Sequence, residues 1–276
     1  MNEGKPVNNR RKIFKWIQVT IIVYCLVGII AYTWQEKLLF HPAALKADAA
    51  FNFPAPYKEV NIPVNPSTKY NIVQFTVPGN NIRGVVLYFH GNKDNITHYA
   101  SAANTITKHG YEVWMIDYPG FGKSTGKINE EVLYDQALQV YKMARVRFSP
   151  DSIIIYGRSL GSGIATQLAT IRDCKRLILE TPYYSIPSLV STYLWMYPLE
   201  RMMKYKFPNN EYLKKVTAPV TIFHGTNDGV IPYKNAVRLK EVLKAGDEFV
   251  SINNGSHNNL KKYKEMTVKL DSVLSL

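Results

Sequence analysis

Residues 152–163 read SIIIYGRSLGSG, and this stretch decides the fold class. Its first five residues are too uniformly apolar to alternate between a wet and a dry face, so they predict a strand covered on both faces. A helix is predicted from residue 160 to residue 172. Between the two, Gly157-Arg158-Ser159-Leu160-Gly161 has the glycines that a tight turn needs if a serine hydroxyl is to project free of the backbone. Ser159 is therefore the candidate nucleophile; the alternative is a glycine-rich turn in which Ser159 only caps the helix.

Strand-like and helix-like stretches alternate on both sides of this turn. Such alternation predicts an α/β fold with a mostly parallel central sheet and flanking helices. An opening hairpin, with Pro78-Gly79-Asn80-Asn81 as its turn, is expected to add an antiparallel edge. The predicted strands are 69–77, 83–89, 111–116, 152–156, 176–180, 220–224 and 248–253, and the predicted helices are 94–109, 129–147, 160–172, 233–244 and 259–274.

A serine hydroxyl is a weak nucleophile unless a base removes its proton, and two loops downstream supply candidates. The sequence HGTNDGVIP (224–232) places Asp228 just after one predicted strand, and GSHNN (255–259) places His257 after the next. With Ser159, both lie at the expected carboxyl ends of strands, where such sheets bind ligands. We expect His257 to accept the serine proton and Asp228 to orient the imidazole. Taken singly, Asp228 could cap a turn and His257 could be a surface loop residue.

Negative charge that develops on a carbonyl oxygen needs N–H donors close to the nucleophile. The amide of Leu160, at the start of the predicted helix, is one candidate. The loop His90-Gly91-Asn92-Lys93 follows a predicted strand and offers Asn92 as the second. His90 precedes Ser159, against the order nucleophile, acid, histidine that this arrangement requires, so it is predicted to be structural. No cluster of His, Asp or Glu predicts a metal, and no cofactor is expected.

Residues 182–215 interrupt the alternation of strands and helices. They are rich in tyrosine and methionine and also contain Trp195. An apolar insertion between two strands of this kind predicts a small helical cap. Ordinary core packing is an equally good explanation for the same composition.

Residues 16–34 read WIQVTIIVYCLVGIIAYTW and carry no charge. A helix of this length spans about 28 Å, close to the hydrocarbon thickness of a bilayer. Trp16, Tyr32 and Trp34 lie near its ends, where amphipathic rings prefer the membrane interface. A retained single-pass transmembrane anchor is predicted. The alternative is a cleaved signal peptide, but the following residues offer no small-x-small cleavage site.

The charges around the apolar segment predict its orientation. Five basic residues precede it and only Lys37 lies close behind it. The positive-inside rule then keeps the N-terminus in the cytoplasm and places the rest of the chain outside it, in the periplasm of a bacterium or in a lumenal or extracellular space of a eukaryote. The preceding basic residues are Lys5, Arg10, Arg11, Lys12 and Lys15.

The chain of 276 residues is thus predicted to contain a basic tail (1–15), a transmembrane anchor (16–34), a connecting segment of irregular structure (35–57) and one α/β domain (58–276). Its net charge of +13 could favour anionic membranes or substrates, but a solvated lysine-rich surface is the better explanation of the same charge. Neither a helix-turn-helix nor an RNA-binding motif is found, so no nucleic-acid partner is predicted. The two cysteines form no disulfide framework. The oligomeric state is left open.

At these residues the chain resembles the α/β-hydrolase superfamily, and within it the membrane-anchored hydrolases grouped with serine aminopeptidases and monoacylglycerol lipases. The resemblance extends over about residues 58–275 and implies an α/β-hydrolase fold with a small helical cap, preceded here by one transmembrane helix. It also implies a triad of Ser159, Asp228 and His257. The matching motifs are YFHGN (88–92), DYPGFGKS (117–124), GRSLGSG (157–163), HGTNDGVIP (224–232) and GSHNN (255–259).

The expected activity is hydrolysis of an ester, thioester or amide through an acyl-serine intermediate. The anchor and the apolar insertion favour a small acyl or lipid-like substrate. A serine peptidase or aminopeptidase is the enzymatic alternative, because fold alone does not fix the substrate. The alternative from another class is a non-catalytic binding module tethered to the membrane.

Overall fold

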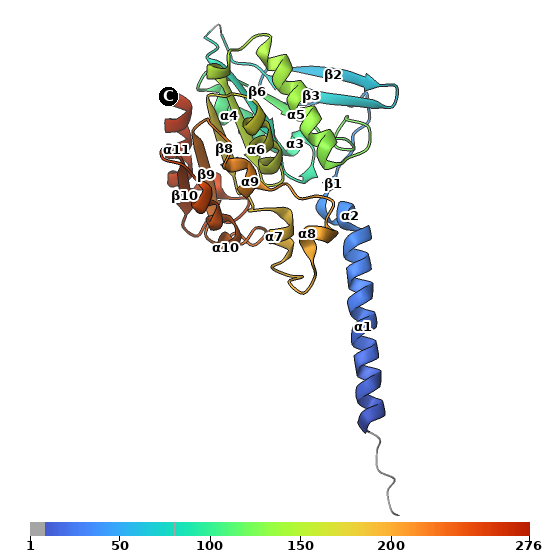
Figure 1. Ribbon diagram of the computed structural model, residues 1–276. Helices are drawn as coiled ribbons and strands as arrows, with labels where there is room; N and C mark the ends of the chain where they lie inside the picture. The colour runs from blue at the N-terminus through green and yellow to red at the C-terminus, as the bar shows by residue number, and fades with distance from the viewer. Residues whose placement is uncertain (1–8, 80) are drawn as a thin grey trace, which may run out of the picture.

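The computed structural model describes residues 9–79 and 81–276, and an eight-stranded sheet forms its centre (Figure 1). Six neighbouring strands, β10, β9, β8, β7, β4 and β6, are parallel to one another. Strand β3 runs antiparallel to both β6 and β2. The mostly parallel sheet is thereby confirmed. In spatial order the strands are β10 (Glu248–Ile252), β9 (Val220–Gly225), β8 (Arg176–Glu180), β7 (Ile153–Arg158), β4 (Gly84–Phe89), β6 (Tyr111–Ile116), β3 (Thr68–Phe75) and β2 (Tyr57–Asn65).

Helices cover both faces of the sheet and also precede it in the chain. The longest helices of the domain are α5, which follows β6, α11, which follows the edge strand β10, and α6, which follows β7. The α-helices are α1 (Asn9–Thr33), α2 (Gln35–Leu39), α3 (Ile96–Tyr99), α4 (Ser101–Thr107), α5 (Glu130–Arg145), α6 (Gly161–Ile171), α7 (Ile186–Val190), α8 (Leu199–Met202), α9 (Asn209–Leu213), α10 (Tyr233–Ala236) and α11 (Lys264–Ser275), and the 3-10 helices are η1 (Pro150–Ser152), η2 (Val237–Val242) and η3 (Leu260–Lys262).

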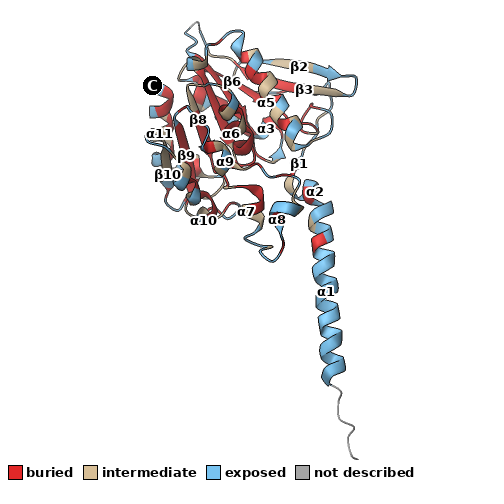
Figure 2. Cartoon of the chain, viewed as in Figure 1, coloured by how far each residue is buried: buried red, intermediate tan, exposed pale blue. Residues whose placement is uncertain are grey.

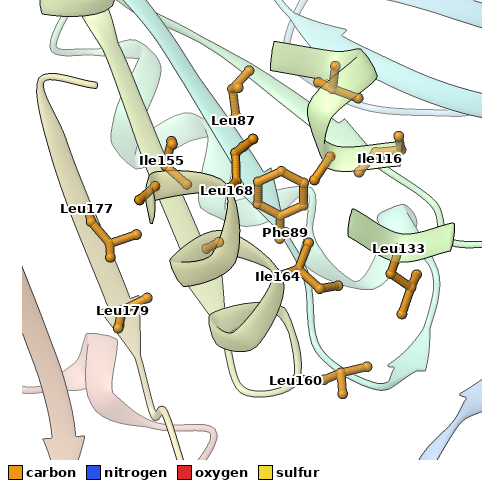
Figure 3. Packing of buried hydrophobic residues seen from close by; sticks show 14 of the residues in the cluster. Leu87, Phe89, Ile116, Leu133, Ile155, Leu160, Ile164, Leu168, Leu177 and Leu179 are labelled. Carbon is orange, nitrogen blue, oxygen red and sulfur yellow. The ribbon is translucent and has the colours of Figure 1, made fainter. Parts of the chain in front are cut away.

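The core has two halves, one on each face of the sheet, because successive strand residues point in opposite directions. Ile155 of β7 joins the cluster that includes Leu168 of α6 and residues of α5, and Figure 3 shows these side chains packed over β4 and β8. Ile154, its neighbour in the strand, joins the cluster that includes Ile106 of α4 and residues of α11. Helices α5 and α6 therefore cover one face, and α4 and α11 cover the other. Figure 2 shows the resulting buried centre.

The predicted hairpin between residues 69–77 and 83–89 is wrong. Strand β6 lies between β3 and β4, and β3 instead forms its hairpin with β2. Ile72 of β3 faces Ile116 of β6, and both side chains are fully buried. Pairing is set by such contacts between distant residues, which a local turn signal does not contain. The predicted turn includes Asn80, which lies outside the described residues.

Three predicted helices are interrupted. The stretch 94–109 contains α3 and α4, and Asn95 caps the first of these by accepting a hydrogen bond from the amide of Thr97. The stretch 233–244 contains α10 and η2, and 259–274 contains η3 and α11. In the last case Tyr263 has an extended backbone, which divides the two helices. The helix predicted at 129–147 forms as α5, with Asn129 as its cap as expected.

The insertion at residues 182–215, named the cap below, holds the three short helices α7, α8 and α9. Tyr183, Tyr205 and Phe207 are buried against the main core, whereas Tyr193 and Trp195 are exposed. Core packing therefore explains the aromatic residues at the two ends of the cap, whereas the exposed aromatic residues in its middle do not pack in the core.

The N-terminal segment separates into an exposed helix and a short attachment to the domain. Helix α1 has 25 residues, long and apolar enough to cross a membrane, and Gly28 is the one buried residue within it. Figure 2 shows it standing away from the domain. The segment 35–57, expected to be irregular, contains α2 and the two-residue strand β1 (His41–Pro42). Strand β1 pairs in parallel with β5 (Lys93–Asp94), so this segment lies against the loop that follows β4.

Candidate active site

The turn at residues 157–161, named the serine turn below, joins β7 to α6 and holds Ser159 in a left-handed conformation with φ = 51°. This conformation is strained for a residue other than glycine and is maintained only where the surroundings enforce it. A Cβ atom at Gly157 would lie 2.5 Å from the carbonyl oxygen of Gly161, and a Cβ atom at Gly161 would lie 2.1 Å from that of Phe89. The two glycines are therefore required by backbone packing, as the sequence predicted.

The structure brings together the three residues expected to act with each other. Nε2 of His257 lies 3.1 Å from Oγ of Ser159, and Nδ1 lies 2.8 Å from Oδ2 of Asp228. An ionised carboxylate can only accept, so Nδ1–H donates to Asp228 and Nε2 is left to accept the serine O–H. This is the tautomer that a base for Ser159 needs.

Asp228 is held ionised by the groups around it. Its side chain is buried, which would raise the pKa of the carboxyl, but the hydrogen bond from His257 and those from the amides of Val230 and Ile231 outweigh burial and lower it. The nearby His224 is buried as well, and loss of hydration lowers its pKa. Burial therefore disfavours the charged form of His224 as a second partner for Asp228.

The two predicted N–H donors belong to segments that adjoin Ser159. Leu160 immediately precedes α6, whose N-terminus adds positive potential at this point. A Cβ atom at Gly91 would lie 3.6 Å from Cβ of Ser159, so the loop that carries Asn92 passes close to the serine. The Asn92 side chain itself donates to the carbonyl of Leu39 at 2.7 Å and is thereby turned toward the N-terminal segment. Only the backbone amide of Asn92 is consequently suited to the predicted role.

A cavity of about 390 Å³ opens over Ser159 and His257. His41 lines it from β1, and Tyr99 and Val230 contribute apolar surface. Sequence reasoning assigned no role to His41. Its proximity results from the pairing of β1 with β5, and the only signal for it in the sequence was the position of His-Pro just after the apolar segment.

Arg158, also missed by the sequence reasoning, ties the serine turn to the loop that carries His257. Its guanidinium lies 3.3 Å from Glu180 and donates to the Asn258 side chain at 3.0 Å. Tyr156 donates to the other oxygen of Glu180 at 2.6 Å. Glu180 is buried, which would raise its pKa, but the charge of Arg158 and the other partners lower it. The result is an ion pair between a buried Glu180 and a largely buried Arg158, the residue that precedes the nucleophile.

His90 does not face Ser159 as a base would. Its ring is buried between those of Tyr99 and Tyr118, with centroids 4.9 and 4.3 Å away, and Nδ1 lies 2.7 Å from the carbonyl of Gly91. This position agrees with the structural role predicted for it. Among the described residues there is no group of three or more His, Cys, Asp or Glu side chains that could hold a metal ion.

Comparison with protein families gives a match over residues 80–214 to the family described as serine aminopeptidase, S33. The matched region contains the serine turn and most of the cap but ends before Asp228. Two curated relatives are the alpha/beta hydrolase domain-containing protein 17C of Xenopus tropicalis and the protein ABHD12B of Homo sapiens, each 29% identical to this chain. The first match covers 70% of this chain and 62% of the relative, and the second covers 58% and 50%. The chain thus matches less than two thirds of the length of either relative.

Similar folds occur among solved structures. An esterase of Pyrococcus furiosus, Pf2001, superposes with a TM-score of 0.66 at 16% identity and covers 86% of this chain and 97% of its own. Est1E of Butyrivibrio proteoclasticus superposes with a TM-score of 0.62 at 17% identity and covers 78% of this chain and 98% of its own. At such low identity these structures establish the fold alone.

Proposed function

We propose that this chain is a serine hydrolase of the α/β-hydrolase superfamily and that it cleaves an ester, thioester or amide. The observation that carries the proposal is the continuous chain of hydrogen bonds from Asp228 through His257 to Ser159, with Ser159 held on a left-handed turn at the floor of a cavity. A serine placed only to cap α6 would need neither the imidazole nor the carboxylate behind it.

The reaction has two halves. Nε2 of His257 takes the proton of Ser159 as Oγ forms a bond to the carbonyl carbon, and the backbone amides of Leu160 and Asn92 hold the oxyanion. The leaving alcohol, thiol or amine departs with the proton from His257, and the acyl group stays on Oγ. Water then attacks the acyl carbon with His257 as the base again, which releases a carboxylic acid and restores Ser159. Asp228 stabilises the imidazolium in both halves.

An acyl or lipid-like substrate is the class that the surroundings favour. The apolar helix α1 is attached to the domain through α2 and β1, and His41 of β1 lines the cavity above Ser159. With α1 in a bilayer, only a few residues separate the cavity from the membrane surface. A substrate that lies in the membrane or is attached to it would therefore reach Ser159 without leaving the interface.

The membrane topology is part of this proposal. Residues 16–34 are the anchor, residues 1–15 the cytoplasmic tail and residues 58–276 the domain on the opposite side, joined by 35–57. The five basic residues before the anchor support this orientation.

An aminopeptidase is the second candidate, favoured by the description of the matching family. Such an enzyme needs a carboxylate that holds the free ammonium group of its substrate. Asp94 is the one carboxylate among the described residues that line the cavity, and it is half-exposed with His98 3.5 Å away. Lys93 and Arg158 bring positive charge to the same cavity. This balance is a poor match for an ammonium group and favours the esterase.

The test is a panel of p-nitrophenyl esters of increasing acyl length, run against aminoacyl p-nitroanilides, with the full chain in detergent micelles. We expect turnover of the esters that disappears in Ser159→Ala. Preference for the anilides would select the aminopeptidase. A folded wild-type protein that hydrolyses neither series would leave the non-catalytic membrane module as the better account.

A further inference from the structure

Two long uncharged stretches lie side by side in the structure although they are far apart in the sequence. No charged residue occurs from 16 to 35 or from 181 to 199. The first stretch forms most of α1, and the second forms the beginning of the cap, including the loop between α7 and α8. That loop, residues 191–198, is named the cap loop, and its Met196 and Tyr197 contact Tyr24 of α1. Figure 1 shows this loop extending from the domain along the upper part of α1.

The contact is specific. The rings of Tyr24 and Tyr197 stack with centroids 4.5 Å apart and an interplanar angle of 7°. The Tyr197 hydroxyl donates to the carbonyl of Tyr24 at 2.7 Å, and the Tyr24 hydroxyl donates to the carbonyl of Met196 at 3.2 Å. Gly28 leaves the space for this ring, because a Cβ atom there would lie 2.9 Å from Cε1 of Tyr197.

The depth of this contact along α1 can be measured against residues that mark a membrane interface. Lys204 lies over the ring of Tyr32 and Lys37 over that of Trp34, at 5.1 and 5.5 Å from the centroids. Aromatic rings with lysines beside them are typical of the headgroup level. Tyr24 precedes Tyr32 by eight residues, which corresponds to about 12 Å along a helix. Half of a hydrocarbon core is about 15 Å thick, so the cap loop reaches well below the headgroups.

The surface of the cap loop suits that depth. Tyr193, Trp195 and Met196 are 65, 76 and 52% exposed, and Trp195 directly precedes Met196 and Tyr197, which contact Tyr24 of α1. The loop also satisfies much of its own backbone, since the amides of Tyr193 and Leu194 donate to Val190 and that of Tyr197 donates to Leu194. Backbone groups in lipid have no water to bind and must form hydrogen bonds within the protein, whereas in water they need not.

We propose that the cap loop is a second membrane-inserted element, which enters the leaflet on the domain's side beside α1 and exposes Trp195 to acyl chains. The inference rests on the proposed anchor, because α1 defines where the bilayer lies. Its consequence is that the cap is immersed in the phase that would supply an acyl substrate, whereas the serine turn remains above the interface.

Trp195 makes the insertion measurable. The chain has four tryptophans, and three of them lie in different predicted surroundings: Trp195 in the leaflet, Trp34 at the interface and Trp114 in the protein core. The full-length wild type and the variants Trp195→Phe, Trp34→Phe and Trp114→Phe are reconstituted into phosphatidylcholine vesicles. Subtracting each variant's emission from that of the wild type isolates one tryptophan. Quenching is then measured with lipids brominated on their acyl chains and with iodide in the water.

We expect the Trp195 emission to be blue-shifted, strongly quenched by the brominated chains and protected from iodide. The Trp114 emission is expected to resist both quenchers. Quenching of Trp195 by iodide but not by bromine would place the cap loop in water and overturn the inference. Resistance of Trp195 to both would show that protein, such as a second copy of the chain, covers it, and would overturn the inference too. If Trp34 also escapes bromine, α1 is not in the bilayer and the inference falls with the anchor.

The outcome is independent of catalysis. Labelling of the Trp195→Phe variant by a fluorophosphonate reports whether the active site is intact, whereas quenching requires no activity. Failure of insertion in a protein that still labels would therefore remove this inference and leave the hydrolase proposal in place.

Discussion

The serine turn and the contact between α1 and the cap loop both depend on a glycine, but the two glycines meet different neighbours. A Cβ atom at Gly161 would lie 2.1 Å from the carbonyl oxygen of Phe89 in the adjacent strand. A Cβ atom at Gly28 would lie 2.9 Å from a carbon of the Tyr197 ring. The first neighbour is main chain fixed by the sheet, and the second is an atom of a side-chain ring, which can shift without moving a strand. The backbone of the sheet thus positions the nucleophile rigidly. The contact between the cap and the anchor is made by side chains and can adjust.

The largest effect is expected from Asp228→Asn, within the rigid region. The amide should keep the hydrogen bonds from Val230 and Ile231 but no longer favour the required imidazole tautomer. We expect kcat/KM for an ester to fall about 10⁴-fold with the fold unchanged. The matched control is Asp94→Asn, which changes the carboxylate that lines the cavity and should alter kcat/KM less than about tenfold. If the two variants lower kcat/KM by the same factor, Asp228 has no specific role in catalysis.

Glu180→Gln should destabilise the protein by about 3 kcal/mol at pH 7, because it leaves the largely buried Arg158 without its ionised partner. The pKa of Glu180 is lowered in the folded state. Its ionised form therefore stabilises the fold fully above the unfolded pKa, about 4.3, and this contribution is lost as the pH falls through the folded pKa. The difference in unfolding free energy between wild type and variant should shrink in acid. Urea denaturation at several pH values measures it.

A control for that experiment is Glu211→Gln, which removes the exposed pair with Lys214, 3.2 Å apart. We expect a change below about 0.5 kcal/mol. A difference between wild type and Glu180→Gln that stays constant down to pH 3 would contradict the assignment of Glu180 as an ionised partner.

Gly161→Ala tests the rigid frame directly. The added methyl group has to displace backbone of β4, and we expect the free energy of unfolding to fall by about 2 kcal/mol. The displacement moves Leu160 and Ser159 as well, so kcat should decrease with it. Denaturation in urea and ester turnover, measured on the same preparation, report the two effects. An alanine variant with wild-type stability would mean that the serine turn can relax.

Gly28→Ala is the counterpart in the adjustable region, and the smallest effect is expected from it. Rotation of the Tyr197 ring should absorb the methyl group, so the unfolding free energy should change by less than about 1 kcal/mol and ester turnover should not change. The stack with Tyr24 should loosen, which a shift in Trp195 emission would report. A loss as large as that of Gly161→Ala would remove the contrast between the two regions.

The same contrast explains how much of the molecule was predictable from its sequence. Gly157, Ser159 and Gly161 predict the serine turn because a tight turn and the helix after it are local requirements. Asp228 and His257 could be located because each follows a recognisable strand. The fold class followed from the alternation of these elements.

The features that were missed depend on contacts between distant parts of the chain. The pairing of β3 with β2 and β6, rather than with β4, depends on which apolar faces meet across the sheet. His41 reaches the cavity only because β1 pairs with β5. The stack of Tyr24 on Tyr197 joins two residues that no local sequence pattern relates. The stretch that contains each of them has the composition of an ordinary apolar segment.

The most direct test of the central claim is the site at which a fluorophosphonate attaches. The full chain in detergent is treated with the probe, digested and analysed by peptide mass spectrometry. The account predicts one adduct, on Oγ of Ser159, formed slowly in His257→Gln and absent in Ser159→Ala. An adduct on a different residue, or none on a folded wild-type protein, would contradict it.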